Sequence, residues 1–348
     1  MGTESSTMQT SERIPVGDAR LPVLIQGGLG VAVSNYRLAR AVAMTGHLGV
    51  VSGTAIDLVL ARRLQDGDPD GEMRAAIEQF PAPDVGAQIL QRYFLPAGRR
   101  GHPYRGVPMH SHRDKHAAQD LLTVAAFVEV MLAKRDHRGR IGINLLTKVQ
   151  IPTVPTLFGA MLAGVDFVLM GAGVPRDVPG ILDRIAVMEP VETRLDVVGA
   201  SATDTIPHLR FDPNRFHISF ALRRPAFLPI VSSHTLAAVL ARKASGSVQG
   251  FIVEAPTAGG HNAPPRGTPR YDALGQPLYG ERDQVDLEAM RDLGLPFWLA
   301  GWRQGLAGAC SRRPRRWCRR GPGRHALRLL SRVGHCARAS LDCARYRG

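Results

Sequence analysis

The first 309 residues of this 348-residue chain contain no cysteine. A chain segment without cysteine needs no disulfide, and it suits a reducing compartment. The chain also lacks an uninterrupted apolar run of about 18 residues, which argues against a membrane span. Residues 1–19 are polar and lack the apolar stretch of a secretory signal. These absences favour a soluble, cytoplasmic protein.

A basic surface spread over the whole chain is also missing. The formal net charge of +14 by itself suggests a nucleic-acid partner. However, residues 302–348 hold 13 Arg and a single acid, Asp342, so the rest of the chain is close to neutral. All four cysteines lie in this tail: Cys310, Cys318, Cys336 and Cys343. Their spacing matches no usual zinc site. We expect no specific nucleic-acid partner and no metal.

Short apolar strands alternate with amphipathic helices over most of the chain, which predicts a parallel sheet with helical crossovers. Strands are expected at 23–26, 48–52, 141–145, 167–170, 228–232, 251–254 and 297–300. Helices are expected at 36–45, 117–134, 153–163, 178–187, 235–243 and 286–293. Ser34 or Asn35 would cap the first helix, and Ser233 a later one. Seven strands are one short of a closed (β/α)8 barrel.

Two segments interrupt this alternation. Residues 66–115 are polar and rich in Pro and Gly, with one short helix expected at 72–79. Residues 194–224 can hold an extra hairpin, built from 195–198 and 217–222. Neither segment has the length or the pattern of an independent domain.

A glycine-rich turn, Gln26-Gly27-Gly28-Leu29-Gly30, directly follows the first strand. Glycines let the backbone approach a planar ligand and expose its N–H groups, but a tight strand-to-helix turn explains them as well. The spacing differs from the Gly-x-Gly-x-x-Gly dinucleotide fingerprint. Asn144 ends another apolar strand, where its amide needs partners from a cofactor edge or from a neighbouring loop.

The segment 254–267 follows a strongly apolar strand and contains a Gly-Gly pair before His261. In a barrel this loop lies at the carboxyl ends of the strands, where active sites form. An imidazole there can act as a general base near neutral pH, whereas the alternative is an ordinary surface histidine. Glu254 either orients His261 or simply ends the strand. Four other histidines lie in one loop, and their spacing favours solvation over metal binding: His102, His110, His112 and His116.

Together these segments resemble the nitronate monooxygenase (2-nitropropane dioxygenase) family over about residues 20 to 301. The matching pieces are LIQGGLGV at 24–31, LGVVSGT at 48–54, GINLL at 142–146, GAMLAGVD at 159–166, AGGH at 258–261 and PFWLAG at 296–301. The resemblance implies an FMN-binding TIM barrel. The flavin-binding residues that it implies are Gln26, Gly27, Gly28, Asn144, Gly259, Gly260 and Gly301.

The implied reaction is oxidation of a nitronate or nitroalkane, with O2 reoxidising the flavin. His261 would be the catalytic base that takes the α-proton of a neutral nitroalkane. One alternative is a related flavin-dependent enoyl reductase that uses NAD(P)H. The other is an inactive remnant whose basic tail binds polyanions nonspecifically.

The tail departs from the family pattern after Gly301. The family continues with a second glycine, a helix and an eighth strand, whereas Trp302 follows here and no eighth strand is readable. With suitable synonymous codons, residues 318–331 read one nucleotide out of register can encode AAGVQVGTLFAYC, which looks like the missing strand and phosphate turn. Our hypothesis is a single-nucleotide shift near Gly301.

Three parts are therefore expected. They are a flexible N-terminus of residues 1–19, an FMN-binding barrel of residues 20–301 whose eighth strand is missing or scrambled, and a disordered tail of residues 302–348. Without its last strand the barrel would have unpaired strand edges and would lack half of the phosphate site, so poor solubility and weak FMN retention are expected.

Overall fold

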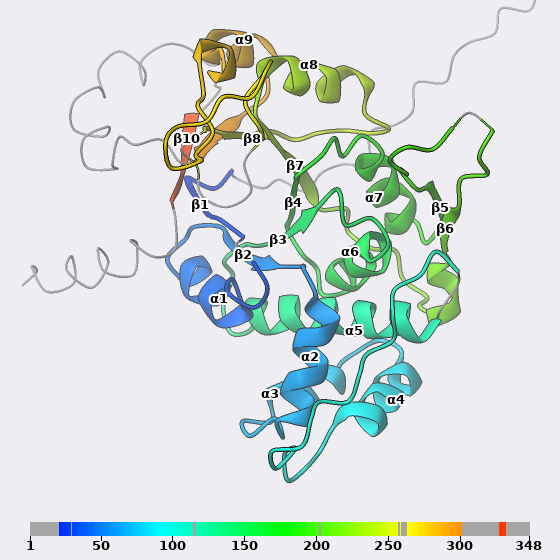
Figure 1. Ribbon diagram of the computed structural model, residues 1–348. Coiled ribbons are helices and arrows are strands. Elements are labelled where there is room, and N and C mark those ends of the chain that lie inside the picture. Colours follow the sequence, from blue (N-terminus) through cyan, green and yellow to red (C-terminus); the bar gives the residue numbers. More distant parts are fainter. Residues whose placement is uncertain are drawn as a thin grey trace, which may run out of the picture.

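The computed structural model describes residues 21–28, 30–113, 116–201, 203–256, 258 and 263–300, and the backbone of residues 327–331. Within these ranges the fold is mixed α/β, with a curled parallel sheet at its centre and helices outside it (Figure 1). The parts expected at 1–19 and, apart from 327–331, at 302–348 lie outside the described residues.

The main sheet follows the order β1-β10-β9-β8-β7-β4-β3-β2, and its paired strands run parallel. Its strands are β1 (Leu24–Gln26), β2 (Gly49–Ser52), β3 (Ile141–Leu146), β4 (Phe167–Gly171), β7 (Ala226–Val231), β8 (Phe251–Glu254), β9 (Phe297–Ala300) and β10 (Leu327–Ser331). All seven expected strands are confirmed, with small shifts of their ends. The first and last strands of this order also meet, because Ile25 forms a parallel bridge with Leu48.

The position between β9 and β1 differs from our expectation. We expected the eighth strand to be missing or scrambled, but the backbone of β10 pairs with both neighbours there. Leu327 lies opposite Phe297 of β9, and Leu329 lies opposite Leu24 of β1. Strand pairing uses main-chain groups that every residue except proline supplies, so an unexpected sequence can still form a ladder.

The helices follow the predicted alternation, with additions in one segment. The six expected helices are α1 (Tyr36–Met44), α5 (His116–Lys134), α6 (Thr153–Leu162), α7 (Val178–Ala186), α8 (His234–Lys243) and α9 (Leu287–Asp292). Asn35 caps α1 by accepting from the Leu38 N–H at 3.1 Å, and Ser233 caps α8 through the Leu236 N–H at 3.1 Å. Three more helices project below the sheet in Figure 1: α2 (Ile56–Gln65), α3 (Glu72–Ile77) and α4 (Pro83–Tyr93). We had expected one of these, the short helix that became α3.

The extra hairpin exists, but its expected strands were wrong. It is formed by β5 (Val191–Arg194) and β6 (His208–Phe211), which pair antiparallel with Val191 opposite Phe211. Those two residues are buried, whereas Val197 and Val198 are exposed. Residues 195–198, the apolar run that suggested a strand, therefore lie in the connection between β5 and β6. A strand is favoured where its side chains pack into the core, as Val191 and Phe211 do.

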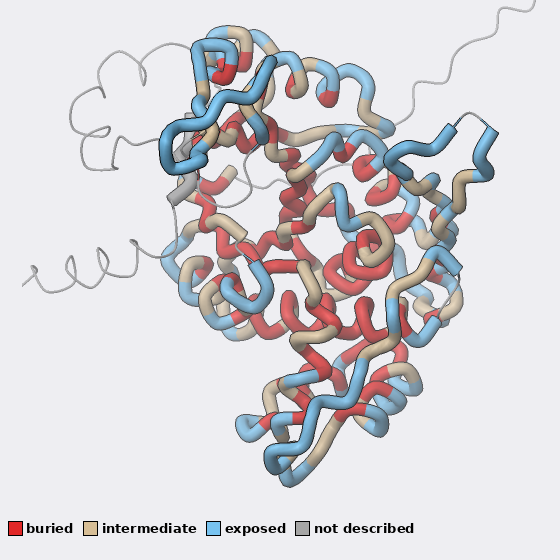
Figure 2. The backbone as a smooth tube through the Cα atoms, viewed as in Figure 1, coloured by how far each residue is buried: buried red, intermediate tan, exposed pale blue. Residues whose placement is uncertain are grey.

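Side chains of the main sheet alternate between two apolar layers. Ile25, Val50 and Ile252 belong to a cluster on the inner face of the curled sheet. Val51 and Val253 belong to the layers between the sheet and the helices. Figure 2 shows these buried strands at the centre of the molecule, inside a more exposed layer of helices and loops. This alternation decides which residues at the strand ends can face a common site.

Helix α5 is the central helix of the outer layer. It is long and apolar enough to cross a membrane, but 72% of its most apolar 18-residue window is buried inside the protein. It packs closely on α6, where a Cβ on Gly159 would lie 2.0 Å from the carbonyl oxygen of Thr123. The apolar length of α5 is therefore explained by its place in the core.

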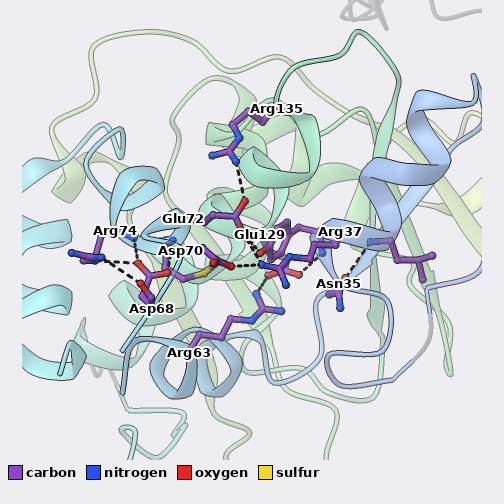
Figure 3. Close-up of polar contacts among 12 residues, drawn as sticks. Asn35, Arg37, Arg63, Asp68, Asp70, Glu72, Arg74, Glu129 and Arg135 are labelled. Carbon is purple, nitrogen blue, oxygen red and sulfur yellow. Dashed lines mark hydrogen bonds and ion pairs between the residues drawn. The ribbon is translucent and has the colours of Figure 1, made fainter. Parts of the chain in front are cut away.

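A polar network joins α1, α2, α3 and α5 (Figure 3). Glu129 of α5 is buried and accepts from the Tyr36 N–H at 2.7 Å and from Arg63 at 2.5 Å. The Tyr36 hydroxyl donates to Glu72 at 2.5 Å, and Arg135 pairs with the same carboxylate at 2.9 Å. Burial, followed by the contact with Glu72, raises the pKa of Tyr36 to about 12. This network fixes the start of α1 just after the glycine-rich turn.

Candidate functional site

The glycine-rich turn after β1 is held in place by Gln26. The side chain is buried, and its Oε1 accepts from the Val50 N–H at 3.0 Å while its Nε2 donates to the Val50 carbonyl at 3.1 Å. Nε2 also lies 2.7 Å from the carbonyl of Gly27 and 3.0 Å from the hydroxyl of Ser34. The amide thus joins β1 to β2 and holds the start of the turn in place.

The turn meets β3 at Gly28 and Asn144. Nδ2 of Asn144 donates to the Gly28 carbonyl at 2.9 Å across 116 residues of sequence. A Cβ on Gly28 would lie 2.3 Å from the Asn144 Cβ, a separation that no side chain tolerates. The structure therefore brings two of the predicted site residues into direct contact, and glycine is required for that contact.

The other end of the Asn144 amide has no partner. Its Oδ1 is buried and accepts no hydrogen bond from the described residues, and the same holds for the hydroxyl of Thr147 at the end of β3. Buried polar atoms are normally paired, so an unpaired acceptor here is a candidate contact for a ligand N–H or O–H group. An added Cβ at Gly27 or Gly30 would meet nothing within 4 Å, so the turn itself borders open space.

Glu254 ends β8 and carries an ionisable group to the same face of the sheet. It follows Val253 of the outer layer, so the alternation places it with Ile252 on the inner face. Burial raises its pKa to about 7. Its carboxyl group can therefore hold or release a proton near neutral pH.

A shallow hollow lies beside Glu254, over the ends of β7 and β8. Ser232, Arg266, Tyr279 and Asp283 contribute to its walls. Arg266 is fixed by hydrogen bonds from its guanidinium to the carbonyls of Ser232 at 3.2 Å and Arg282 at 2.7 Å. The loop after β8 thus returns over the strand ends and encloses part of this hollow.

The predicted site residues divide into two groups. Gln26, Gly27, Gly28 and Asn144 gather where β1 and β3 end. The other predicted residues lie outside the described part of the chain: His261, Gly259, Gly260 and Gly301. The structure adds Thr147 to the candidates. Its place just after an apolar strand was the only sequence signal that pointed to it.

The expectation for the histidine-containing loop was wrong at His110. Its Nε2 lies 3.1 Å from a carboxylate oxygen of Asp57, a buried residue in the first turn of α2. The hydrogen bond to Asp57 raises the pKa of His110 above its usual value. This histidine ties the loop to α2 instead of standing in solvent. Within the described ranges, no three His, Cys, Asp or Glu side chains are grouped closely enough to hold a metal ion.

Comparisons with known proteins give limited results. No known family profile matches the chain, and no characterised protein matches it in sequence. Among solved structures, FabK from Thermotoga maritima matches with a TM-score of 0.38 and 13% identity, covering 89% of this chain and 58% of that one. A point mutant of the same FabK gives a TM-score of 0.38 and 12% identity, covering 89% of this chain and 61% of that one.

A nitroalkane oxidase from Streptomyces ansochromogenes matches with a TM-score of 0.34 and 12% identity, covering 80% of this chain and 58% of that one. The chain therefore spans about three fifths of the length of these solved chains. Likenesses of this size carry no argument about function, which depends on the chain's own residues.

Proposed function

We propose that this chain is an FMN-dependent oxidoreductase built on a (β/α)8 barrel, and that it oxidises a nitronate or nitroalkane with O2. The observation that carries the proposal is the contact between Gly28 and Asn144, beside which the Asn144 Oδ1 is buried and has no partner among the described residues. The reaction class comes from the resemblance of the sequence to the nitronate monooxygenase family.

The described residues fit a flavin ring. The edge of the isoalloxazine offers an N–H group, which is the donor that the Asn144 Oδ1 lacks. The backbone at Gly27 and Gly28 can approach a planar group closely, because neither residue carries a side chain. By the resemblance, Gly259 and Gly260 would also contact the flavin, and Gly301 would contact its phosphate. When bound, FMN would supply the redox step, taking electrons from the substrate and passing them to O2.

The protein's share is to position groups and move protons. Gln26 fixes the turn through its bonds to Val50, so Gly28 and Asn144 are held before any ligand arrives. His261 would take the α-proton of a neutral nitroalkane, so that the C–H bond breaks and the proton moves to the imidazole. A nitronate has already lost that proton and would not need this step.

A flavin titration tests the proposal. We expect FMN added to the purified chain to change its visible spectrum on binding, and Asn144→Ala to weaken the affinity about tenfold, the effect of losing one buried hydrogen bond. Anaerobic ethyl nitronate should then bleach the bound flavin, whereas NADH should not. Bleaching by NADH alone would favour the enoyl reductase alternative. No FMN binding by the folded chain would overturn the proposal.

A further inference from the structure

Glu254 is an unusual residue to find on the inner face of the sheet. In β8 the side chains alternate, with Ile252 in the inner apolar cluster and Val253 in the outer one. Glu254 therefore points to the inner side, opposite Ala300 of β9. A carboxyl group at this end of an inner-facing row lies where parallel sheets bind their ligands.

Three other polar side chains around the hollow already have partners. The Arg266 guanidinium donates to two carbonyls, and the Tyr279 hydroxyl donates to the carbonyl of Ala263 at 3.1 Å. Asp283 accepts from the Gly280 N–H and the Arg266 N–H, both at 2.8 Å. Among the described residues, none gives the carboxyl group of Glu254 a hydrogen bond or an ion pair. This carboxyl is therefore one of the groups of the wall that can meet a ligand.

The chemistry of this carboxyl near neutral pH follows from its surroundings. Arg266, Tyr279 and Asp283 are the titratable groups that line the hollow with it, but burial alone accounts for the raised pKa of about 7. A protonated carboxyl group is a hydrogen-bond donor, whereas a carboxylate is only an acceptor. An anionic oxygen placed in the hollow would therefore be attracted by the protonated form and repelled by the ionised one.

We propose that Glu254 is an oxyanion-binding residue, which donates its carboxyl proton in a hydrogen bond to an anionic oxygen of the substrate. The positive charge of Arg266 on the same wall favours an anion as well. If the proposed function holds, on which the choice of substrate rests, this oxygen belongs to the nitro or nitronate group. Glu254 would then serve the oxygen end of the substrate.

The first part of the test needs neither flavin nor substrate. Carboxyl carbons of glutamate are followed by NMR from pH 4 to pH 9 in the full chain and in Glu254→Gln. We expect one resonance with a midpoint of about 7 that is absent from the variant. Glu281→Gln, which changes an exposed glutamate of the same loop, should leave that resonance in place. A Glu254 resonance with a midpoint near the ordinary 4.5 would overturn the proposal.

The second part measures binding of nitrite, a small oxyanion, by calorimetry between pH 6 and pH 9. Above pH 7, affinity for the unaltered chain should fall about tenfold per pH unit, because the protonated form binds. Glu254→Gln should bind nitrite with little pH dependence, since its amide N–H donates at every pH. Glu281→Gln should follow the unaltered chain. An unchanged pH slope in Glu254→Gln, or no nitrite binding at all, would overturn the proposal.

The two proposals can fail separately. Nitrite binding with the expected slope in a chain that binds no FMN would support the oxyanion site and contradict the proposed function. FMN binding with nitronate oxidation, together with an ordinary Glu254 midpoint, would do the reverse.

Discussion

Gly28 decides at the scale of a single residue whether the turn after β1 can touch β3. The Asn144 side chain occupies the space where a Cβ would stand. The same turn contains Gly30, which borders open space. Packing against Asn144 therefore requires glycine at position 28, whereas no neighbouring atom requires it at position 30, although the two glycines look alike in the sequence.

We predict that Gly28→Ala lowers the free energy of unfolding by about 1–3 kcal/mol, as overpacking usually does, and weakens FMN binding with it. Gly30→Ala is the matched control, and it should change stability by no more than about 0.5 kcal/mol. Urea unfolding of both variants measures the difference. Equal stabilities would show that the turn relaxes away from Asn144.

The raised pKa of Glu254 predicts that the free energy of unfolding falls as the pH rises toward neutrality. Below pH 4.5 the carboxyl is protonated in the folded and the unfolded chain alike. Between pH 4.5 and about 7 the unfolded chain releases a proton that the folded chain keeps, so the free energy of unfolding falls as the pH rises. Glutamine cannot ionise, so Glu254→Gln should gain stability relative to the unaltered chain from pH 4 to pH 8. Thermal melts at both pH values test this, and a constant difference would contradict it.

At the scale of elements, the buried carboxylate of Glu129 accepts a hydrogen bond from a main-chain N–H group at the start of α1, which has no acceptor within its own helix. Glu129 of α5 accepts from the first N–H of α1, so one helix caps another. Free N–H groups at a helix start need such acceptors. The contact fixes α1, and with it the turn that precedes α1, on the long buried helix.

We expect Glu129→Ala to destabilise the fold by about 3 kcal/mol, because it leaves Arg63 and the Tyr36 N–H without their acceptor. Asp136→Asn removes ion pairs to Arg40 and Arg135 in which the aspartate is exposed, and asparagine tolerates the left-handed φ of 63° at this position. This change should cost under about 1 kcal/mol. Chemical denaturation of the two variants makes the comparison. Similar losses for both would mean that burial does not distinguish these ion pairs.

At the scale of the whole molecule, β10 joins the two sides of the sheet. Its backbone pairs with β9 and β1, which would otherwise present unpaired edges. Exposed edges of parallel strands favour pairing between molecules. The poor solubility that we expected from a missing strand therefore depends on whether residues 327–331 keep this pairing.

Two truncations answer that question. Deletion of residues 302–348 removes β10 and should lower the melting temperature and promote aggregation. Deletion of residues 332–348 keeps β10 and should leave the melting temperature within a few degrees of the full chain. Size-exclusion chromatography and thermal melts measure both effects. Equal behaviour of the two truncated chains would show that β10 contributes nothing to closure.

The sequence by itself determined the alternation of seven strands and six helices along the chain. Strands buried on both faces must be apolar along their length, so continuous apolar runs such as those of β4 and β7 predict strands. The helices between them need a polar face, which gives a different pattern. Asn35 and Ser233 were readable for the same reason, because capping acts over three residues. The turn from Gln26 to Gly30 was readable as a glycine cluster.

Only the tertiary structure decided which of those residues meet. The contact of Gly28 with Asn144, the pairing of His110 with Asp57 and the half-buried position of Glu254 each depend on segments far apart in the sequence. The same is true of β10, whose place follows from main-chain pairing with β9 and β1. Local patterns act through nearest neighbours, whereas burial and charge pairing depend on what folding brings close together.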